Sequence, residues 1–247
     1  MKSFTRNSAA VIAGAMLTVS ASSQAAMQTL MGDDLIFTYD DSTLFGTANV
    51  VGNSIFFLPT NFLAQATNTD GAVVVTDLVD IRIQVKEGST FLIDSFALFE
   101  SGDYQLVNTP TPGGNVDPGA PTVDVDAFLQ VTSNTHLCMM GGFPLPCNMA
   151  TTTDAGTLNN ASGNLEQWSL SAGLDLDNMP IWGDDFDVIV RIQNTVEATS
   201  LELGDSALIQ KKFGAIGVDV MAEVPVPAAA WLFGSALAGL VASRRRR

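Results

Sequence analysis

Acidic side chains are the most frequent groups in this sequence that could do chemistry. Several of them cluster in one stretch of chain and form a candidate set: Asp175, Asp177, Asp184, Asp185 and Asp187. Oxygen ligands in loops suit calcium, so these aspartates are candidate calcium ligands. The twelve-residue calcium loop does not fit when it starts at Asp175, because Pro180 then stands where that loop needs glycine. The favoured interpretation is a set of solvated turn acids and strand caps, and a structural calcium site is the alternative.

The two cysteines, Cys138 and Cys147, enclose a segment rich in glycine and proline. The N-terminus, described below, indicates export, and two cysteines at this spacing in an exported chain predict a local disulfide that closes the loop. A second interpretation adds soft ligands, since the single histidine, His136, and three nearby methionines could hold Cu(I). No known copper spacing is reproduced, so the disulfide is the prediction.

Catalytic motifs that use histidine are absent from the sequence. With one histidine there is no His-Glu-x-x-His motif, and neither a Gly-x-Ser-x-Gly elbow nor a phosphate-binding glycine loop is present. A glycosidase needs only two carboxylates about 5–10 Å apart, and the 26 acidic residues offer many such pairs by chance. We therefore predict a protein that is not an enzyme and has no cofactor other than calcium. A glycan-cleaving domain is the alternative.

Aromatic residues offer a further alternative, which is glycan binding by ring stacking. Trp182 stands in an acidic stretch between a proline and a glycine, surroundings that favour an exposed ring and a platform for sugars. Trp168 lies in a segment with strand-like alternation, which is more typical of a core residue. Exposure of Trp182 favours sugar binding, and burial disfavours it.

Both ends of the chain carry targeting patterns, and the N-terminal one is a secretory signal peptide. Lys2 and Arg6 precede an uncharged apolar stretch that ends in small residues. This pattern predicts a signal peptide over residues 1–25, with cleavage after Ala25. We therefore expect the rest of the chain to leave the cytoplasm.

The C-terminal end combines a proline motif, an apolar run and an arginine cluster. The motif is Val224, Pro225, Val226, Pro227 and Ala228, and the cluster is Arg244, Arg245, Arg246 and Arg247. Residues 228–242 carry no charge, and as a helix they span about 22 Å at roughly 1.5 Å per residue. We predict a short transmembrane helix over 228–242, with the arginines in the cytoplasm by the positive-inside rule.

This tail resembles the PEP-CTERM sorting signal in its V-P-x-P-A (VPLPA-like) variant. The resemblance covers Val224–Arg247, and Val226 takes the place of the usual glutamate. It implies a protein held in the inner membrane with its ectodomain in the periplasm, then handled by exosortase, an integral-membrane cysteine protease, and moved to the cell surface or outside the cell. Most members of this class come from Gram-negative bacteria that make exopolysaccharide. The implied partners are exosortase, the inner membrane before processing, and exopolysaccharide.

The exported part, residues 26–223, is strongly acidic. It holds five basic residues against 26 acidic ones, a formal charge of −21. Such a polyanion repels nucleic acid, so no nucleic-acid partner is expected. Cations, neutral glycans and basic surfaces remain as partners. The function expected from these observations is a non-catalytic surface or matrix protein associated with exopolysaccharide and biofilm.

The elements that must position these residues alternate with a period of two. Val79, Ile81 and Ile83 share one face of a strand, and Val188, Val190 and Ile192 share one face of another, so all six are expected in the core. Asp70-Gly71 and Glu87-Gly88 are expected to be turns at the two ends of the longest strand.

Other runs with strand character complete the prediction of fold class. They are Leu35–Tyr39, Ala48–Val51, Ser54–Leu58, Phe91–Phe99, Val123–Val131, Leu165–Leu170, Ala207–Phe213 and Ile216–Ala222. Phe62–Ala66 is expected to form one helical turn. The sequence therefore predicts an all-β fold, an antiparallel sandwich or jelly roll over 26–223, between a signal peptide and a sorting tail.

Overall fold

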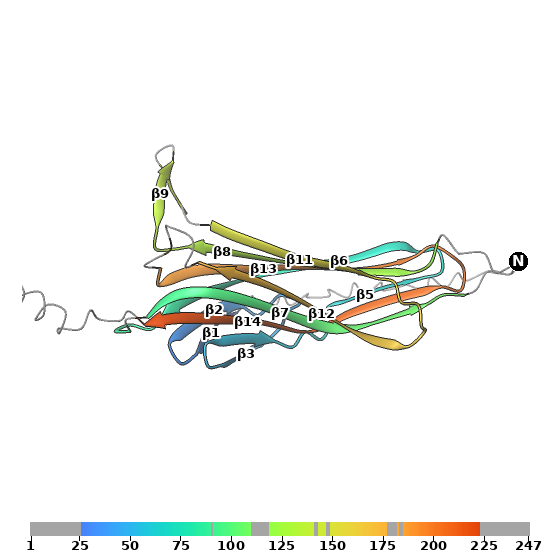
Figure 1. The fold of residues 1–247 in the computed structure, drawn as a ribbon, viewed down its shortest axis with the longest axis horizontal. Helices are drawn as coiled ribbons and strands as arrows, with labels where there is room; N and C mark the ends of the chain where they lie inside the picture. Colours follow the sequence, from blue (N-terminus) through green and yellow to red (C-terminus); the bar gives the residue numbers. More distant parts are fainter. Residues whose placement is uncertain are drawn as a thin grey trace, which may run out of the picture.

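The computed structural model describes residues 26–89, 91–109, 119–140, 143–146, 149–176, 182 and 185–222. Two antiparallel sheets lie face to face along the length of the molecule, with β8, β11 and β13 in one layer and β7, β12 and β14 in the other (Figure 1). The all-β sandwich predicted from the sequence is confirmed. Within the described ranges no helix has the length and apolarity that a membrane crossing needs.

The first sheet has six strands in the order β1, β2, β6, β13, β8 and β11. Their bounds are Met27–Met31 (β1), Leu35–Asp40 (β2), Gly71–Val85 (β6), Asp187–Ser200 (β13), Thr122–Ser133 (β8) and Met149–Leu158 (β11). At its centre Val190 of β13 stands opposite Ile81 of β6 on one side and Val131 of β8 on the other. Because β13 is paired on both sides, it is one of the best protected strands of this sheet.

The second sheet has the order β12, β7, β14, β4 and β3, and β5 also pairs with β14. Its bounds are Leu165–Asp175 (β12), Phe91–Val107 (β7), Ser206–Ala222 (β14), Ser54–Phe57 (β4), Ala48–Val51 (β3) and Leu63–Thr67 (β5). β14 pairs with β7 along one edge, and along its other edge with β5 at 206–210 and β4 at 214–217. The last of the described strands, β14, is therefore central, not an edge strand.

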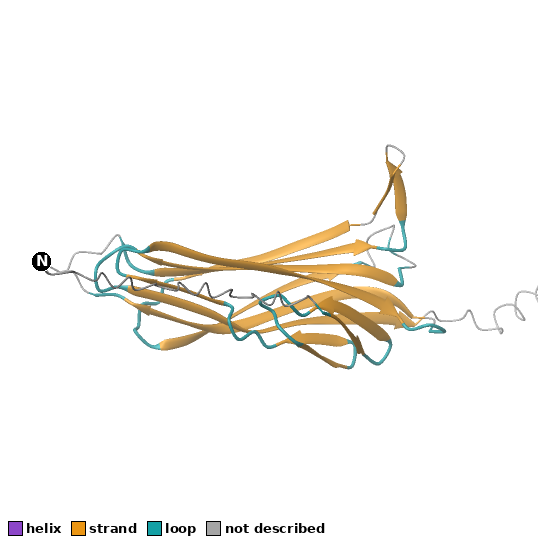
Figure 2. Cartoon of the chain, turned by 180° about the vertical axis from the view of Figure 1, so that it is seen from behind, coloured by secondary structure: helices purple, strands orange, loops and turns teal. Residues whose placement is uncertain are grey.

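A small hairpin projects from one end of the sandwich. It consists of β9 (Leu137–Met140) and β10 (Phe143–Pro146), which pair only with each other in the described part of the chain. Figures 1 and 2 show it standing off the two layers, at the same end as the C-terminal end of β14. Every other described strand belongs to one of the two sheets (Figure 2).

The core follows the predicted alternation. All six residues expected there are at most 1% exposed: Val79, Ile81, Ile83, Val188, Val190 and Ile192. The turns predicted on either side of the run that forms strand β6 are also confirmed, since Gly71 and Gly88 have φ of 76° and 82°. A residue with a Cβ rarely adopts such positive φ, and this is why glycine stands at both positions.

One local prediction was wrong. The segment 62–66 was expected to form a helical turn, but Leu63–Thr67 is strand β5. Ala64 and Ala66 are fully buried, while Leu63 and Gln65 point outward. The small side chains carry a weak period-two signal, and five hydrogen-bonded positions opposite β14 decide the conformation.

Candidate functional site

Three polar side chains meet in the core between the sheets. Lys211 of β14 and Glu100 of β7 come from the second sheet, and Asn194 of β13 comes from the first. Lys211 and Glu100 are fully buried, and Asn194 is 1% exposed. Buried charges are rare unless they are paired. These three residues, called the inter-sheet cluster below, are therefore the strongest candidate for a group with a special role.

Each member of the inter-sheet cluster contacts the other two. The Nζ of Lys211 lies 2.7 Å from Oε1 of Glu100, and Nδ2 of Asn194 donates to Oε2 of Glu100 at 2.5 Å. The Nζ of Lys211 also donates to Oδ1 of Asn194. The amine, the carboxyl and the amide thus form a closed ring of interactions.

Strand geometry explains why these polar side chains point inward. Each stands two residues after a buried apolar residue of its own strand and so shares its inward face. The pairs are Leu98 and Glu100, Ile192 and Asn194, and Ile209 and Lys211. A bulge at Lys212 then shifts the register of β14, so that Gly214 also faces the cluster. A Cβ on Gly214 would lie 3.2 Å from Nζ of Lys211, so glycine leaves room for the lysine.

Aromatic rings enclose the amine. The Nζ of Lys211 lies 4.3 Å from the ring centroid of Phe45 and 5.6 Å from that of Phe62. Both rings are fully buried, and they meet edge to face with centroids 5.7 Å apart. A cation in this position is attracted to the ring faces, and the rings exclude water from the cluster.

Burial controls the ionisation of the pair. Removal from water raises the pKa of the Glu100 carboxyl and lowers the pKa of the Lys211 amine, while the attraction between the two charges acts against both shifts. Both burial effects favour a neutral acid beside a neutral amine. A neutral, desolvated lysine amine is a nucleophile, so this cluster has chemical as well as structural potential.

The sequence analysis did not single out this cluster. Its signal is nevertheless visible in the sequence, because Lys211, Asn194 and Glu100 each occupy an apolar-face position in a period-two run. A charged residue at such a position predicts a buried partner. The identity of the partner depends on how β7, β13 and β14 are brought together, which local periodicity does not encode.

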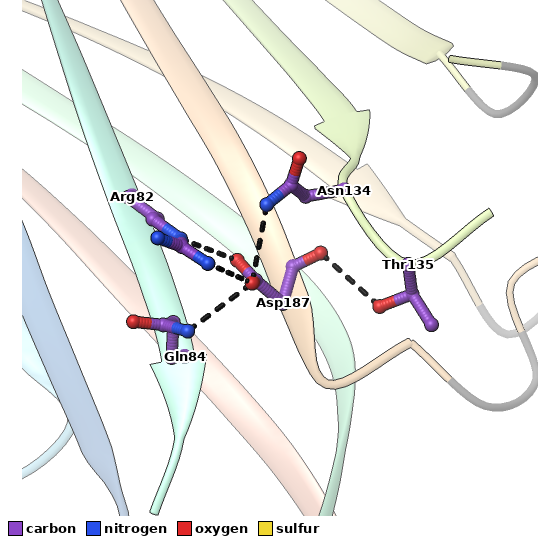
Figure 3. A network of polar contacts seen from close by, with 5 residues as sticks. All are labelled: Arg82, Gln84, Asn134, Thr135 and Asp187. Carbon is purple, nitrogen blue, oxygen red and sulfur yellow. Dashed lines mark hydrogen bonds and ion pairs between the residues drawn. The ribbon is translucent and has the colours of Figure 1, made fainter. Parts of the chain in front are cut away.

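Asp187, one of the predicted calcium ligands, is held by protein donors. Arg82 binds it in a two-pronged contact, Nε to Oδ1 at 3.0 Å and Nη2 to Oδ2 at 2.5 Å. Gln84 and Asn134 each donate to Oδ2 at 3.1 Å, and Thr135 donates to the backbone oxygen (Figure 3). Both carboxylate oxygens are thus engaged where β6, β8 and β13 meet.

Asp185, a second predicted ligand, is fully buried. Its Oδ1 accepts from Oγ of Ser133 at 2.5 Å and lies 3.0 Å from Nδ1 of His136. In a serine hydrolase the serine would donate to the ring nitrogen that the carboxylate does not bind. Here the serine and Nδ1 converge on the same carboxylate oxygen, so the three side chains do not form that arrangement.

The remaining calcium candidates give no assembled site. Asp175 is exposed at the end of β12, and Asp177 and Asp184 lie outside the described residues. In the described part of the chain no three His, Cys, Asp or Glu side chains gather closely enough to hold a metal ion. The second oxygen of Asp185, Oδ2, is buried with no hydrogen-bond partner among the described residues.

Trp182 does not present the ring that a sugar platform requires. It is 4% exposed, and Trp168 is 5% exposed with Nε1 donating to the backbone oxygen of Gln210 at 3.2 Å. The expectation of an exposed Trp182 is therefore corrected. The tryptophan stands beside acids in the sequence, but its large apolar ring is covered by the fold.

Several further predictions concern residues that the structure does not describe. Cys138 lies on β9, but Cys147 is not among the described residues, so the disulfide stays a prediction. The same holds for the signal peptide, the sorting motif Val224–Ala228, the helix over 228–242 and the cluster Arg244–Arg247.

Comparison with known proteins identifies no family. No protein-family model matches the sequence, and no curated protein matches it. Among solved structures, one match is the crystal structure of the enzymatically active domain of tailspike protein 4 from bacteriophage CBA120, with 8% sequence identity and a TM-score of 0.20. The match covers 64% of this chain and 20% of the tailspike chain. A likeness of this size transfers neither fold nor activity.

Proposed function

We propose that this protein is a non-catalytic component of the cell surface or extracellular matrix, exported and sorted by exosortase, and associated with exopolysaccharide. Residues 1–25 direct export, residues 26–223 form the displayed sandwich, and residues 224–247 retain it in the inner membrane until exosortase acts. The tail that resembles the PEP-CTERM signal supports this sorting route.

The observation that carries the proposal is the way in which the sandwich meets the tail. β14 ends at Ala222, and the sorting motif begins two residues later at Val224. β14 pairs with β7 from Ser206 to Ala222, and on its other edge with β5 at 206–210 and with β4 at 214–217. A pull on the tail along the strand direction is therefore resisted by hydrogen bonds to three strands. A C-terminal tail that follows directly from a central strand suits a protein that is anchored by that tail and displayed.

Charge supports the same function. The sandwich region carries a formal charge of −21, and a hydrated anionic matrix is an environment in which such a surface stays soluble and meets divalent ions.

The catalytic arrangement that His136 could have supplied with Ser133 and Asp185 is not formed.

The experiment is fractionation of cells that carry a matching exosortase and express the full-length chain. We expect the protein in the inner membrane and then at the cell surface. Replacement of Arg244–Arg247 by serines should release or misplace it, because the positive end that fixes the helix is lost. The control is a chain with Val74→Ser, an exposed change in the sandwich that should not alter location. Protein that stays in the cytoplasm with residues 1–25 uncleaved would contradict the proposal.

Glycan binding is a second candidate, favoured by exposed aromatic rings on the outer face of the second sheet. Phe213 lies 6.2 Å from Phe56 in a stacked arrangement and 6.1 Å from Phe99, measured between ring centroids. Phe99 is 46% exposed. Asp103 and Lys212 line a depression that includes Phe99, so polar groups lie beside the rings. Rings with adjacent polar groups can stack on and orient a sugar.

The test is a glycan array with the exported protein, with and without calcium. If glycan binding is a function of this face, a bound glycan should be lost in Phe99→Ser and kept in Val74→Ser. Binding that survives Phe99→Ser would place the glycan elsewhere, and no binding by the unaltered protein would remove this second candidate.

A further inference from the structure

We propose that Lys211 and Asn194 become joined by an isopeptide bond between Nζ and Cγ, formed within the folded chain with release of ammonia and with Glu100 as the proton carrier. The bond would link β14 in one sheet to β13 in the other. This inference rests on the inter-sheet cluster alone and does not depend on the proposed function.

The reacting atoms are already adjacent. The Nζ of Lys211 is hydrogen-bonded to Oδ1 of Asn194, and the carbonyl carbon lies about 1.2 Å beyond that oxygen. A small movement therefore brings the amine to the roughly 3–3.5 Å approach from which bond formation proceeds. The strands hold both side chains in place, so the entropy of bringing an amine and an amide together is already lost on folding.

Glu100 is placed to serve both nitrogens. Its Oε1 lies 2.7 Å from the attacking Nζ, and its Oε2 lies 2.5 Å from Nδ2, the nitrogen that would leave. One carboxyl can thus accept a proton at one oxygen and donate a proton from the other. A carboxyl that merely neutralised a buried lysine would not need to contact the leaving nitrogen of the amide.

The reaction balances without any further reactant. A proton passes from the Lys211 ammonium to Glu100 and leaves a neutral amine, whose lone pair forms the bond to Cγ of Asn194 while the carbonyl pair moves to Oδ1. Glu100 takes a proton from Nζ and delivers one to Nδ2. The pair on Oδ1 then reforms the carbonyl, the Cγ–Nδ2 bond breaks, and ammonia leaves. Glu100 therefore ends as the neutral acid, holding the proton that the Lys211 ammonium gave up in the first step.

The surroundings favour this reaction over hydrolysis. Burial raises the pKa of Glu100 and lowers the pKa of Lys211, which favours the proton transfer that makes the amine a nucleophile. Phe45 and Phe62 pack around the amine and exclude the water that would otherwise compete for the amide carbon. Gly214 leaves space beside Nζ for the lysine to move.

The consequence is a covalent link between the sheets. β14 leads directly to the C-terminal residues, and β13 is central in the first sheet. A bond between them would prevent the two layers from separating when the end of β14 is pulled. Unfolding by heat or denaturant would then leave a closed loop between residues 194 and 211.

The test is mass spectrometry after tryptic digestion of the denatured full-length protein. Arg191, Lys211 and Lys212 place both reacting residues in one peptide. Without the bond, trypsin cuts after Lys211 and gives residues 192–211 at full mass. With the bond, Lys211 resists trypsin and the peptide becomes 192–212, lighter by one ammonia. Fragmentation should give no backbone fragments from inside the loop between 194 and 211.

These measurements separate the proposal from other losses of ammonia. A succinimide at Asn194 would leave Lys211 open to trypsin. Lys212→Arg should keep the cross-linked peptide, whereas Lys211→Arg, the same change one residue earlier, should abolish it. Glu100→Gln should leave the two residues unlinked, and a link that forms at the normal rate in this variant would refute the role of Glu100. A full-mass 192–211 peptide from the unaltered protein overturns the proposal itself.

Discussion

Lys211 and Lys212 are adjacent in the sequence but lie in opposite surroundings. The side chain of Lys211 is fully buried against Glu100, whereas that of Lys212 is 49% exposed beside Asp103. A buried charge that loses its partner costs about 3–5 kcal/mol, and an exposed ion pair contributes about 0–1 kcal/mol. The consequences of removing each lysine should therefore differ sharply.

We predict that Lys211→Ala lowers the free energy of unfolding by at least about 3 kcal/mol, because it removes the buried side chain to which Glu100 is paired and leaves that carboxyl unpaired in the core. Lys212→Ala is the matched control, and it should change the same quantity by less than about 1 kcal/mol. Urea titration followed by circular dichroism measures both values. Equal losses in the two variants would show that the inter-sheet cluster is not a special part of the core.

One carboxylate on the second sheet, Glu166, should make the free energy of unfolding depend on pH in the acid range. Hydrogen bonds from Ser162, Tyr104 and Asn160 lower the pKa of Glu166 below its ordinary value. A carboxyl with a lowered folded-state pKa contributes stability above its unfolded pKa of about 4.3, and loses that contribution as the pH falls through the folded value. In Glu166→Gln the free energy of unfolding should therefore fall less steeply below about pH 5. Identical acid curves for the two proteins would contradict this.

Pairing of β7 with β14 depends on a close approach at one glycine. A Cβ on Gly102 would overlap the backbone oxygen of Gln210 and stand 2.8 Å from Nε1 of Trp168. At Gly156 of β11, by contrast, a Cβ would find its nearest neighbour, Cδ2 of Leu170, at 4.0 Å. The same substitution, glycine to alanine, can therefore be compared at a crowded position in β7 and at an open position in β11.

Gly102→Ala should lower the melting temperature strongly, because the backbones of β7 and β14 must move apart to admit the methyl group. Gly156→Ala should leave the melting temperature unchanged or raise it. The entropic cost of ordering the backbone on folding is about 0.5–1 kcal/mol smaller for alanine than for glycine. Differential scanning calorimetry measures both. A stable Gly102→Ala variant would mean that the two strands are not this close.

The strand β6 offers a direct test of the sandwich. Ile83 is fully buried between Phe37 of β2 and Val188 of β13, and Ile83→Ala should cost about 2–5 kcal/mol through lost burial and a cavity. Val74 is 53% exposed on the same strand, and Val74→Ala should cost much less. Chemical denaturation separates the two, and a small loss at Ile83 would contradict a core at this position.

The sequence predicts a strand where apolar residues alternate, and it gives little signal where they do not. Ile81 and Val190 mark the inward faces of β6 and β13 clearly. β11, Met149–Leu158, is an edge strand rich in threonine with few large apolar residues, so its pairing with β8 decides its conformation. The inter-sheet cluster was not predicted for a related reason. Its three members lie far apart in the chain and meet only when the sheets pack.

At the scale of the whole molecule, the sandwich separates a protected interior from a strongly acidic exterior. The single buried lysine of β14 is matched by Glu100 inside, while most of the −21 charge of residues 26–223 remains for the surface. Such a surface repels nucleic acid and other polyanions and attracts divalent cations. We therefore expect the interior to provide mechanical integrity and the exterior to contact the hydrated matrix of the proposed function.

The proposed route of export and exosortase sorting is best tested by identifying the two ends of the mature protein. The full-length chain is expressed in a cell with a matching exosortase, recovered from the cell surface, and its terminal peptides are sequenced by mass spectrometry. We predict that the recovered chain begins at Ala26 and ends near Val224–Pro227. A protein recovered from the cytoplasm that still carries both residues 1–25 and Arg244–Arg247 would contradict it.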